Sequence, residues 1–399
     1  MGAARRIKVG IFFNVRRQQG GMYQYALTLV DCLCRYVPEF DYSLYHATLE
    51  ELPLHLSGEN WRHVKFSCRA IQIRLMAEAF LLGAARAGIW MPFSLIPEYH
   101  EIKHDHPDLM IYVKPGVHSF QWKYRAIFPI HDLQHRLQPE FPEVSENGEY
   151  RRREYFYTRS ISKASAILTD SETGREDVIN CYGVDKNKIF PIPYIAPTFR
   201  TTQTSPDFLE HIKKKYSLPS HYLFYPAAFW EHKNHARLIQ AIAILATQKN
   251  VRIPLILAGT KRAEYNKLAS LVDLLGLRDT VNFIGYVPDE DMAALYRQAL
   301  ALVMPTFFGP TNIPILEAWM AECAVITSGL RGIREHVGDA ALLVDPRNEH
   351  TIATAIWSLY ESPELRKELI ERGRTRAMQW TPQRFAQRLA DAILYSVAH

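Results

Sequence analysis

Short apolar runs alternate with segments of helical periodicity along much of the chain. In the first half, KVGIFF, AIFPIHD and SAILTDS are strand-like, whereas YQYALTLVDCLCRY and ETGREDVINCYG have helical spacing. From Tyr222 the pattern restarts with YLFYPAAF and runs to AALLVD, with helix-like segments between the strand-like runs. Strands that alternate with helices predict parallel sheets with crossover connections. The restart predicts two such sheets, and therefore an α/β protein with two doubly wound lobes.

The boundary between the lobes is expected between Pro191 and Ser220. The segment IPYIAPTFRTTQTSP is rich in Pro and Thr, and a helix-like stretch follows it. We therefore expect a first lobe over residues 1–200 and a second over 201–379, with two helices in the tail. The last helix, over 380–399, is a candidate to pack back on the first lobe. Two facing lobes of this kind bind ligands in the cleft at the carboxyl ends of their strands.

Composition narrows the functional classes. The formal net charge of +5 and the pI near 8.8 permit anionic ligands or an acidic membrane surface without requiring nucleic acid. Five cysteines without a Cys-x-x-Cys pair favour a reducing cytoplasm over a disulfide framework or a zinc site. The most apolar stretch, Met76 to Phe93, is interrupted by Glu78 and Arg86. We therefore expect a cytoplasmic chain with no transmembrane helix and no nucleic-acid partner.

Two glycines follow the first strand-like run, in QQGGMYQYALTLV. Gly20 and Gly21 lie where a βα turn opens a helix, and they would let backbone amides approach a ligand at the positive helix end. A tight turn without a ligand is the alternative.

Two other strand-like runs of the first lobe are followed by polar candidates. His131 ends a strand, where ligands gather in doubly wound sheets. The alternative is a solvated His131 beside a cap formed by Asp132. Arg175 lies at a helix start behind Ser171 and Glu172, a candidate cap, and both binding and structural roles stay open for it.

The first turn of the second lobe, in FYPAAFWEHKNHARLIQA, places Lys233 just before a helix. A cation is unfavourable there because the amino end of a helix is already positive. An anionic ligand would resolve this conflict, and a solvated Lys233 is the alternative.

The stretch TFFGPTNIPILEA joins a buried strand to a helix through an unusual turn. Gly309 should permit an unusual backbone dihedral, Pro310 fixes the chain, and the amides from Thr311 through Asn312 to Ile313 are expected to form a nest for a phosphate. Glu317 follows one helical turn later. Its two carboxylate oxygens match the vicinal hydroxyls of a ribose.

The run Asp289-Glu290-Asp291 matches an Asp-x-Asp pattern that can hold a metal-bound nucleotide. A helix cap by Asp289 with Asp291 in the first turn explains the run without a metal. No other cluster has suitable ligand spacing, so we expect no metal and no cofactor.

The ordered set of motifs resembles the retaining nucleotide-sugar glycosyltransferases of glycosyltransferase family four, which have the GT-B architecture of two Rossmann-like lobes facing a cleft. The resemblance rests on GGMYQYALTL, IFPIHDLQHRLQPEF, ILTDSETGREDVI, the KN of WEHKN, FIGYVPDEDMAALYRQA and ALVMPTFFGPTNIPILEAWMAECAVITS, followed by GIREHVGDAALLVDP. These motifs cover most of the chain in the expected order.

The resemblance implies roles for individual residues. It implies that Glu317 binds the donor ribose, that Lys233 binds the diphosphate, and that His131 contacts the donor sugar near the reaction centre. Gly20 and Gly21 match the family's amino-terminal glycine loop. The segment beside the nucleotide base corresponds to Tyr286 and Val287.

Two positions depart from the family pattern. The first Glu of the acidic motif is Gly309 here, and the arginine usually found five residues before the lysine is Ala228. Both positions belong to the part of the site that holds the sugar diphosphate. We expect the backbone amides of Thr311 and Asn312, together with Lys233, to replace these contacts.

The sequence therefore predicts a retaining hexosyltransferase, in surface polysaccharide or lipopolysaccharide synthesis, that uses a nucleoside diphosphate sugar, with GDP-mannose preferred, and a glycan or lipid-linked acceptor. A catalytically silent sugar-binding subunit and a GT-B epimerase or phosphorylase are the alternatives. The segment WRHVKFSCRAIQIRLMAEAFLLGAARAGIW is expected to form a core-packed helix pair. Its alternative is a surface for peripheral contact with the inner face of the cell membrane.

Overall fold

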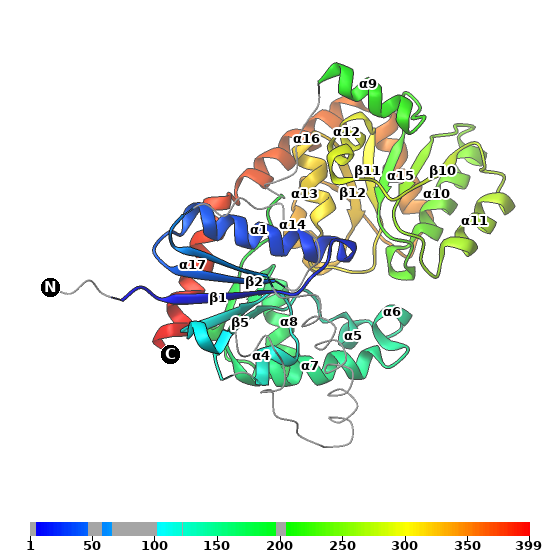
Figure 1. The fold of residues 1–399 in the computed structure, drawn as a ribbon. Coiled ribbons are helices and arrows are strands. Elements are labelled where there is room, and N and C mark those ends of the chain that lie inside the picture. The colour runs from blue at the N-terminus through cyan, green and yellow to red at the C-terminus, as the bar shows by residue number, and fades with distance from the viewer. Residues whose placement is uncertain (1–4, 47–57, 66–101, 122, 197–204) are drawn as a thin grey trace. The chain divides into compact units, whose positions relative to one another are not determined.

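The computed structural model describes residues 5–46, 58–65, 102–121, 123–196 and 205–399, and the chain divides into two compact units (Figure 1). The first unit comprises Met1–Leu133, Arg151–Pro193 and Pro382–His399, and the second comprises Gln134–Tyr150 and Tyr194–Thr381. The expected division at residue 200 did not anticipate that residues 134–150 belong to the second unit. This segment packs there through Phe141 and Val144, which form a small apolar cluster with Phe307.

The first unit is built on a parallel sheet of seven strands in the order β3-β2-β1-β4-β5-β6-β7. The strands are β1 (Lys8–Phe13), β2 (Asp41–His46), β3 (Trp61–Lys65), β4 (Leu109–Tyr112), β5 (Arg125–Pro129), β6 (Ala164–Thr169) and β7 (Ile189–Pro191). The described helices are η1 (Arg17–Gln19), α1 (Gly21–Tyr36), α4 (Val117–Gln121), α7 (Glu149–Lys163), α8 (Glu172–Tyr182), η3 (Lys186–Lys188) and α17 (Pro382–Ala398). The last helix, α17, packs beside α1 and against β4, β5 and β6.

The second unit repeats this plan with a parallel sheet of six strands in the order β10-β9-β8-β11-β12-β13. The strands are β8 (Leu223–Pro226), β9 (Leu255–Ala258), β10 (Val281–Gly285), β11 (Ala301–Met304), β12 (Ala324–Ser328) and β13 (Leu342–Val344). The helices are α5 (Gln134–Leu137), α6 (Pro142–Ser145), α9 (Pro206–Lys215), η4 (Glu231–Lys233), α10 (His235–Gln248), α11 (Tyr265–Leu274), α12 (Asp289–Gln298), α13 (Ile313–Met320), α14 (Arg331–Val337), α15 (Glu349–Glu361) and α16 (Pro363–Met378). The expected restart at Tyr222 is confirmed, because β8 begins one residue later.

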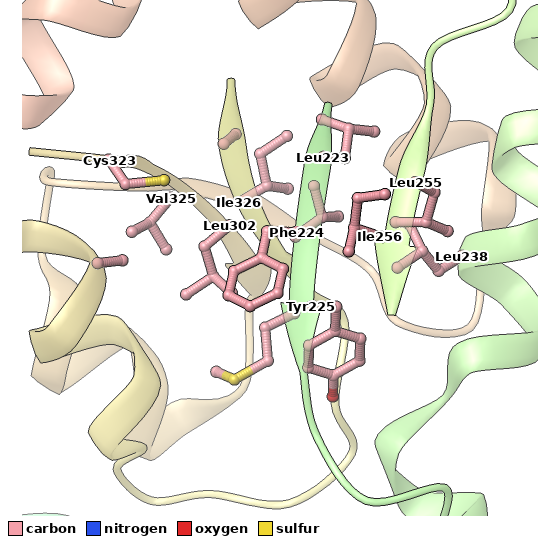
Figure 2. Close-up of a cluster of buried hydrophobic side chains, with 14 of the residues drawn as sticks. Leu223, Phe224, Tyr225, Leu238, Leu255, Ile256, Leu302, Cys323, Val325 and Ile326 are labelled. Atoms are coloured by element: carbon pink, nitrogen blue, oxygen red, sulfur yellow. The ribbon is translucent and has the colours of Figure 1, made fainter. Parts of the chain in front are cut away.

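Helices cover the second sheet, so its strands are apolar on both faces. Leu223, Phe224 and Tyr225 succeed one another along β8, and none of them is exposed to solvent. Figure 2 shows them among Leu255 and Ile256 of β9 and further apolar side chains of the neighbouring elements. This core fixes the positions of the strand ends from which the polar turns start.

Both sheets have a topological switch point. In each, the chain winds outward in one direction through three strands and then continues on the other side of the first strand. Successive connections therefore diverge between β1 and β4 in the first unit and between β8 and β11 in the second. Crevices of this kind, at the carboxyl ends of the strands, are where doubly wound sheets bind ligands.

Two further sequence expectations differ from the structure. Trp61–Lys65 form the edge strand β3 instead of the start of a helix pair, and they pair in parallel with β2. The rest of that expected pair, including the stretch from Met76 to Phe93, lies outside the described residues. Asp289 is the first residue of α12, not its cap, because Pro288 occupies the cap position. Among the described residues, no helix combines the length and the apolarity needed to cross a bilayer.

Candidate functional site

In the second unit, the turns that follow β8 and β11 are tied together at the switch point. The carbonyl oxygen of His232, in the first turn, accepts hydrogen bonds from the amide of Phe307 at 2.8 Å and from the hydroxyl of Thr306 at 3.2 Å. The carbonyl of Thr306 in turn accepts a bond from the Ser328 hydroxyl at 2.5 Å. The turn that carries Lys233 and the turn that leads to Gly309 therefore form one connected framework.

Asn234 is the central link of this framework. Its backbone is left-handed, with φ of 60° and ψ of 33°, a conformation that Asn tolerates better than most residues. Its buried side-chain amide donates to the carbonyls of Pro305 at 2.8 Å and Pro346 at 2.7 Å. One side chain thus joins the ends of three loops, and it does so directly beside Lys233.

We expect Asn234→Ala to lower the free energy of unfolding of the second unit by about 2 to 4 kcal/mol. The substitution leaves two buried carbonyls without their hydrogen-bond donor. It also puts alanine in a left-handed backbone conformation, which is less favourable for alanine than for asparagine. Asn234→Gly is the matched control, because it keeps the backbone relaxed and removes only the two hydrogen bonds. Urea unfolding followed by a probe in the second unit measures both. A loss below about 0.5 kcal/mol for the Ala variant would show that this link does not hold the turns.

Lys233 ends the 3-10 helix η4 and is half-buried. Its carbonyl accepts a hydrogen bond from the hydroxyl of Tyr225 at 3.0 Å, which fixes the backbone of the turn to the core. The next residue but one, His235, is buried, and its pKa is lowered to about 3 by burial and by the charges of Lys233 and His232. His235 therefore stays neutral and does not compete with Lys233 for an anion.

His232 is held by groups that sequence reasoning did not single out. Its ring stacks on Phe308 at 3.9 Å between centroids, and its Nδ1 lies 3.1 Å from Oε1 of Glu143, which also accepts from the His232 amide at 3.2 Å. Burial tends to raise the pKa of Glu143, but its bonds to His232 outweigh this and lower it below the ordinary value. Glu143 therefore remains an anion that positions the turn before Lys233.

The turn from Gly309 to Ile313 differs from expectation in one respect. Gly309 has no left-handed φ, and a β-carbon there would make only an ordinary contact with Ile333 at 3.4 Å, so neither its φ nor the space around it requires glycine. The carbonyl of Gly309 instead accepts a hydrogen bond from Gln134 at 3.1 Å, and the Gly309–Pro310 peptide bond is cis. Asn312 precedes α13, with its side chain bonded to the carbonyl of Phe308 at 3.2 Å instead of capping the helix.

The amides of Thr311, Asn312 and Ile313 thus stand at the amino end of α13, where a helix dipole favours an anion. Glu317 lies in the next turn of the same helix and is half-buried. Its Oε2 accepts a hydrogen bond from the hydroxyl of Tyr296 on α12 at 3.0 Å. This bond fixes one oxygen, and a carboxylate can accept several more hydrogen bonds.

The turn after β10 is the remaining candidate in the second unit. Gly285 has φ of 75°, which favours glycine, and Tyr286 after it is 61% exposed. Val287 is buried in the core and cannot offer a side chain to a ligand. Tyr286 is therefore the residue of this pair with an aromatic face available to a base.

In the first unit, His131 follows β5 and is half-buried. Its Nε2 lies 3.3 Å from the carbonyl of Val113, after β4, and its ring meets Tyr25 of α1 edge-on at 4.9 Å between centroids. Burial lowers the pKa of His131, although Val113 and Asp132 oppose the shift. The imidazole is thus neutral at physiological pH, with its ring orientation fixed.

Gly20 and Gly21 stand at the start of α1, whose Tyr25 contacts His131. Gly20 has φ of 56° and ψ of −121°, and both glycines are exposed. The turn thus needs glycine for its backbone conformation, and ligand contact remains a prediction. Arg175 forms an ion pair with Glu172 at 3.1 Å. Ser171 caps this helix, as expected, because its hydroxyl accepts a hydrogen bond from the amide of Gly174.

The acidic run lies in the first turn of α12, as expected for Asp291, and Asp291 also has a tertiary role. Asp291 is buried and accepts hydrogen bonds from Lys215 and from the Tyr216 hydroxyl, each at 2.6 Å. It therefore ties α12 to α9. Within the described parts of the chain, no three His, Cys, Asp or Glu side chains are grouped as metal ligands.

Residues 209–376 match the model of the family described as glycosyl transferases group 1. The chain is 28% identical over 271 residues to O-antigen chain mannosyltransferase B of Escherichia coli, covering 68% of this chain and 70% of that protein. It is 25% identical over 223 residues to the serotype-specific mannosyltransferase WbdA of Escherichia coli, covering 55% of this chain. The match spans only 27% of WbdA.

The fold is that of solved structures such as WaaG, a glycosyltransferase involved in lipopolysaccharide biosynthesis, which superposes with a TM-score of 0.68 over 98% of this chain and 99% of that chain, at 16% identity. HepE of Anabaena, in complex with UDP and glucose, superposes with a TM-score of 0.69 over 98% of this chain and 100% of that chain, at 16% identity. At this identity the likeness concerns the fold alone. Together with the two parallel sheets, it shows that the chain has the GT-B fold, and residues 209–376 within it match a glycosyl transferases group 1 domain.

Proposed function

We propose that the chain is a retaining hexosyltransferase that transfers mannose from GDP-mannose to a glycan or lipid-linked acceptor in surface polysaccharide synthesis. The observation that carries the proposal is the joined pair of turns at the β8–β11 switch point, with Lys233 on one and the amino end of α13 on the other. The preference for mannose draws support from relatives named as mannosyltransferases. The O-antigen name of one relative supports the acceptor class.

The proposed mechanism depends on leaving-group stabilisation. As the bond between the sugar and the diphosphate breaks, the sugar gains oxocarbenium character and negative charge grows on the departing phosphate oxygen. Lys233 and the amides of Thr311 to Ile313 would bind this charge. Glu317 would hold the ribose, Tyr286 would lie beside the base, and the neutral His131 would orient the sugar through a hydrogen bond.

A thermal-unfolding panel of GDP, UDP and dTDP tests this assignment. A nucleotide at about 100 times its dissociation constant adds about 2.7 kcal/mol to the stability of the form that binds it. We expect GDP to give the largest shift. If UDP or dTDP shifted the transition further, the GDP-mannose preference would be wrong. No shift with any nucleoside diphosphate would contradict the donor site itself.

We expect turnover to persist in the presence of a chelator. Within the acidic run at 289–291, Asp291 already accepts hydrogen bonds from Lys215 and Tyr216. Initial rates measured with and without EDTA check this expectation. A rate that falls with EDTA and returns with magnesium or manganese would show that a metal carries part of the leaving-group charge.

A catalytically silent sugar-binding subunit is the second candidate, favoured by Gly309 and Ala228 in place of charged residues. It would bind a nucleotide sugar without releasing nucleotide in the presence of any acceptor. Among enzymes, release of phosphorolysis products only with inorganic phosphate would favour a phosphorylase. Inversion of a stereocentre of the sugar without an acceptor would favour an epimerase.

We further propose peripheral contact of the chain with the inner face of the cell membrane. Co-flotation of the chain with anionic vesicles tests this proposal.

A further inference from the structure

The second unit contains a cavity of about 540 Å³ beside the η4 turn, within the range of about 300 to 1,000 Å³ that is typical of small-molecule sites. It is bounded by the start of α10, the start of α11, the loop before α15 and the 134–150 segment. Its lining consists of Glu140, Phe141, Trp230, Glu231, Asn234, His235, Ala236, Arg237, Glu264, Lys267, Leu268, Phe307 and Arg347. Among these described residues, none is assigned above to the donor.

Aromatic rings form part of this wall. Trp230 is half-buried and lines the cavity, and the guanidinium of Arg262 lies over its ring at 5.1 Å. Phe141 packs on Phe307 at 5.2 Å between centroids. Arg237 and Arg347 lie over the Phe307 ring at 5.6 and 5.5 Å.

Charges of both signs line the same cavity. Glu264 forms an ion pair with Lys267 at 2.7 Å. The pKa of Glu231 is raised by burial and by the charges of Glu264 and Glu143. His235 is neutral, as described above. An anionic ligand would meet the carboxylates, and a cationic ligand would meet the guanidinium groups of Arg237 and Arg347.

The ligand that suits such a wall is uncharged and carries many hydroxyl groups. Carboxylates accept hydrogen bonds from hydroxyl groups, and guanidinium groups donate hydrogen bonds to hydroxyl groups. A polyol can therefore bind to the negative and the positive side chains alike. The apolar C–H face of a pyranose ring packs on an indole ring, while its hydroxyls point to the polar rim. A nucleoside diphosphate lacks this balance because its charge is negative.

We propose that this cavity binds a neutral oligosaccharide segment of the acceptor glycan, at a position separate from the donor site. Its identification as the acceptor rests on the proposed function, whereas glycan binding as such does not. Trp230 provides the stacking surface, and Arg347 with Glu264 provides hydrogen bonds from two other elements of the fold. A longer acceptor would gain affinity here that a disaccharide lacks.

Calorimetry with the full chain, mannobiose and a longer linear mannose oligosaccharide tests the proposal without any donor present. We expect the longer glycan to bind more tightly, and Trp230→Ala to weaken its binding by about five- to tenfold. Because Trp230 also belongs to the turn before Lys233, Arg347→Ala is the second variant, with an expected loss of about threefold or more. Trp357→Ala is the matched control, since Trp357 also lies under a cation, Lys249, but outside the cavity.

Unchanged affinity in both folded cavity variants, equal loss in Trp357→Ala, or no glycan binding by the unsubstituted chain would overturn the proposal. Loss of GDP affinity with intact glycan affinity in Arg347→Ala would also overturn it, because the cavity would then serve the nucleotide. In transfer assays, KM for the long acceptor should rise in Arg347→Ala, with KM for mannobiose and kcat unchanged. Glycan binding that depends on Trp230 in a chain without transferase activity would refute the proposed function and leave this inference standing.

Discussion

Lys233→Met should lower kcat by about 100- to 1,000-fold, by comparison with the removal of a single oxyanion donor. The reason is that Ala228 stands where the resemblance to glycosyltransferase family four implies an arginine, so under the proposed mechanism one ammonium group would carry most of the side-chain stabilisation of the departing diphosphate. The effect on KM should be smaller, because charge on the leaving oxygen grows only as the bond breaks. Steady-state kinetics on folded variants measures both constants.

Lys233→Arg is the matched variant, and it should recover only part of the lost rate. A planar guanidinium cannot take the position of a compact ammonium without moving a turn that Tyr225 and Asn234 hold in place. A fall in kcat of less than about tenfold for Lys233→Met would assign the leaving-group role to another cation, with His232 and Arg331 as the candidates. The proposed mechanism would then be wrong at its central step.

The sequence was sufficient to predict most of the second unit. Its strands are short, apolar on both faces and separated by helices with clear periodicity, so YLFYP, LILA and LVMP each became a strand. Prediction was poorer in the first unit. The strands Asp41–His46 and Leu109–Tyr112 were not anticipated, and Trp61–Lys65 were expected in a helix. Polar and aromatic residues interrupt the apolar pattern in Asp41–His46 and in Trp61–Lys65. In addition, pairing with neighbouring strands that are distant in sequence decides whether a segment becomes a strand.

The candidate site shows the same limit. Sequence spacing could place Lys233 in a turn and Glu317 on a helix, but not the partners that hold these segments. Glu143 reaches His232 across 89 positions, and Tyr296 reaches Glu317 across 21, because helix register and strand order bring them together. Gly309 suggested a special dihedral because glycine permits one, whereas the structure uses its carbonyl as an acceptor for Gln134.

The bond between Tyr296 and Glu317 opens a direct test of the ribose assignment. Tyr296 is fully buried, and its hydroxyl donates a hydrogen bond to Glu317, so Glu317 also has a structural role. Two roles make different predictions. If Glu317 only satisfies Tyr296, its loss should lower stability and leave nucleotide affinity unchanged. If it also binds the ribose, affinity must fall in a variant that remains folded.

We expect Glu317→Ala to weaken GDP binding by about 1.5 to 3 kcal/mol, the range for hydrogen bonds to a charged group. Calorimetry at a temperature well below unfolding separates this loss from the stability cost of leaving the Tyr296 hydroxyl without its acceptor. Tyr296→Phe is the matched control, because it removes the same bond from the other side and keeps the carboxylate. It should cost no more than about 0.5 to 1.5 kcal/mol of affinity, since the carboxylate itself is kept for the ribose hydroxyls. An equal loss in the two variants would mean that the bond to Tyr296 orients the site as a whole. Unchanged affinity in folded Glu317→Ala would remove the carboxylate from the donor site, and α13 would then contribute only its amino-terminal amides.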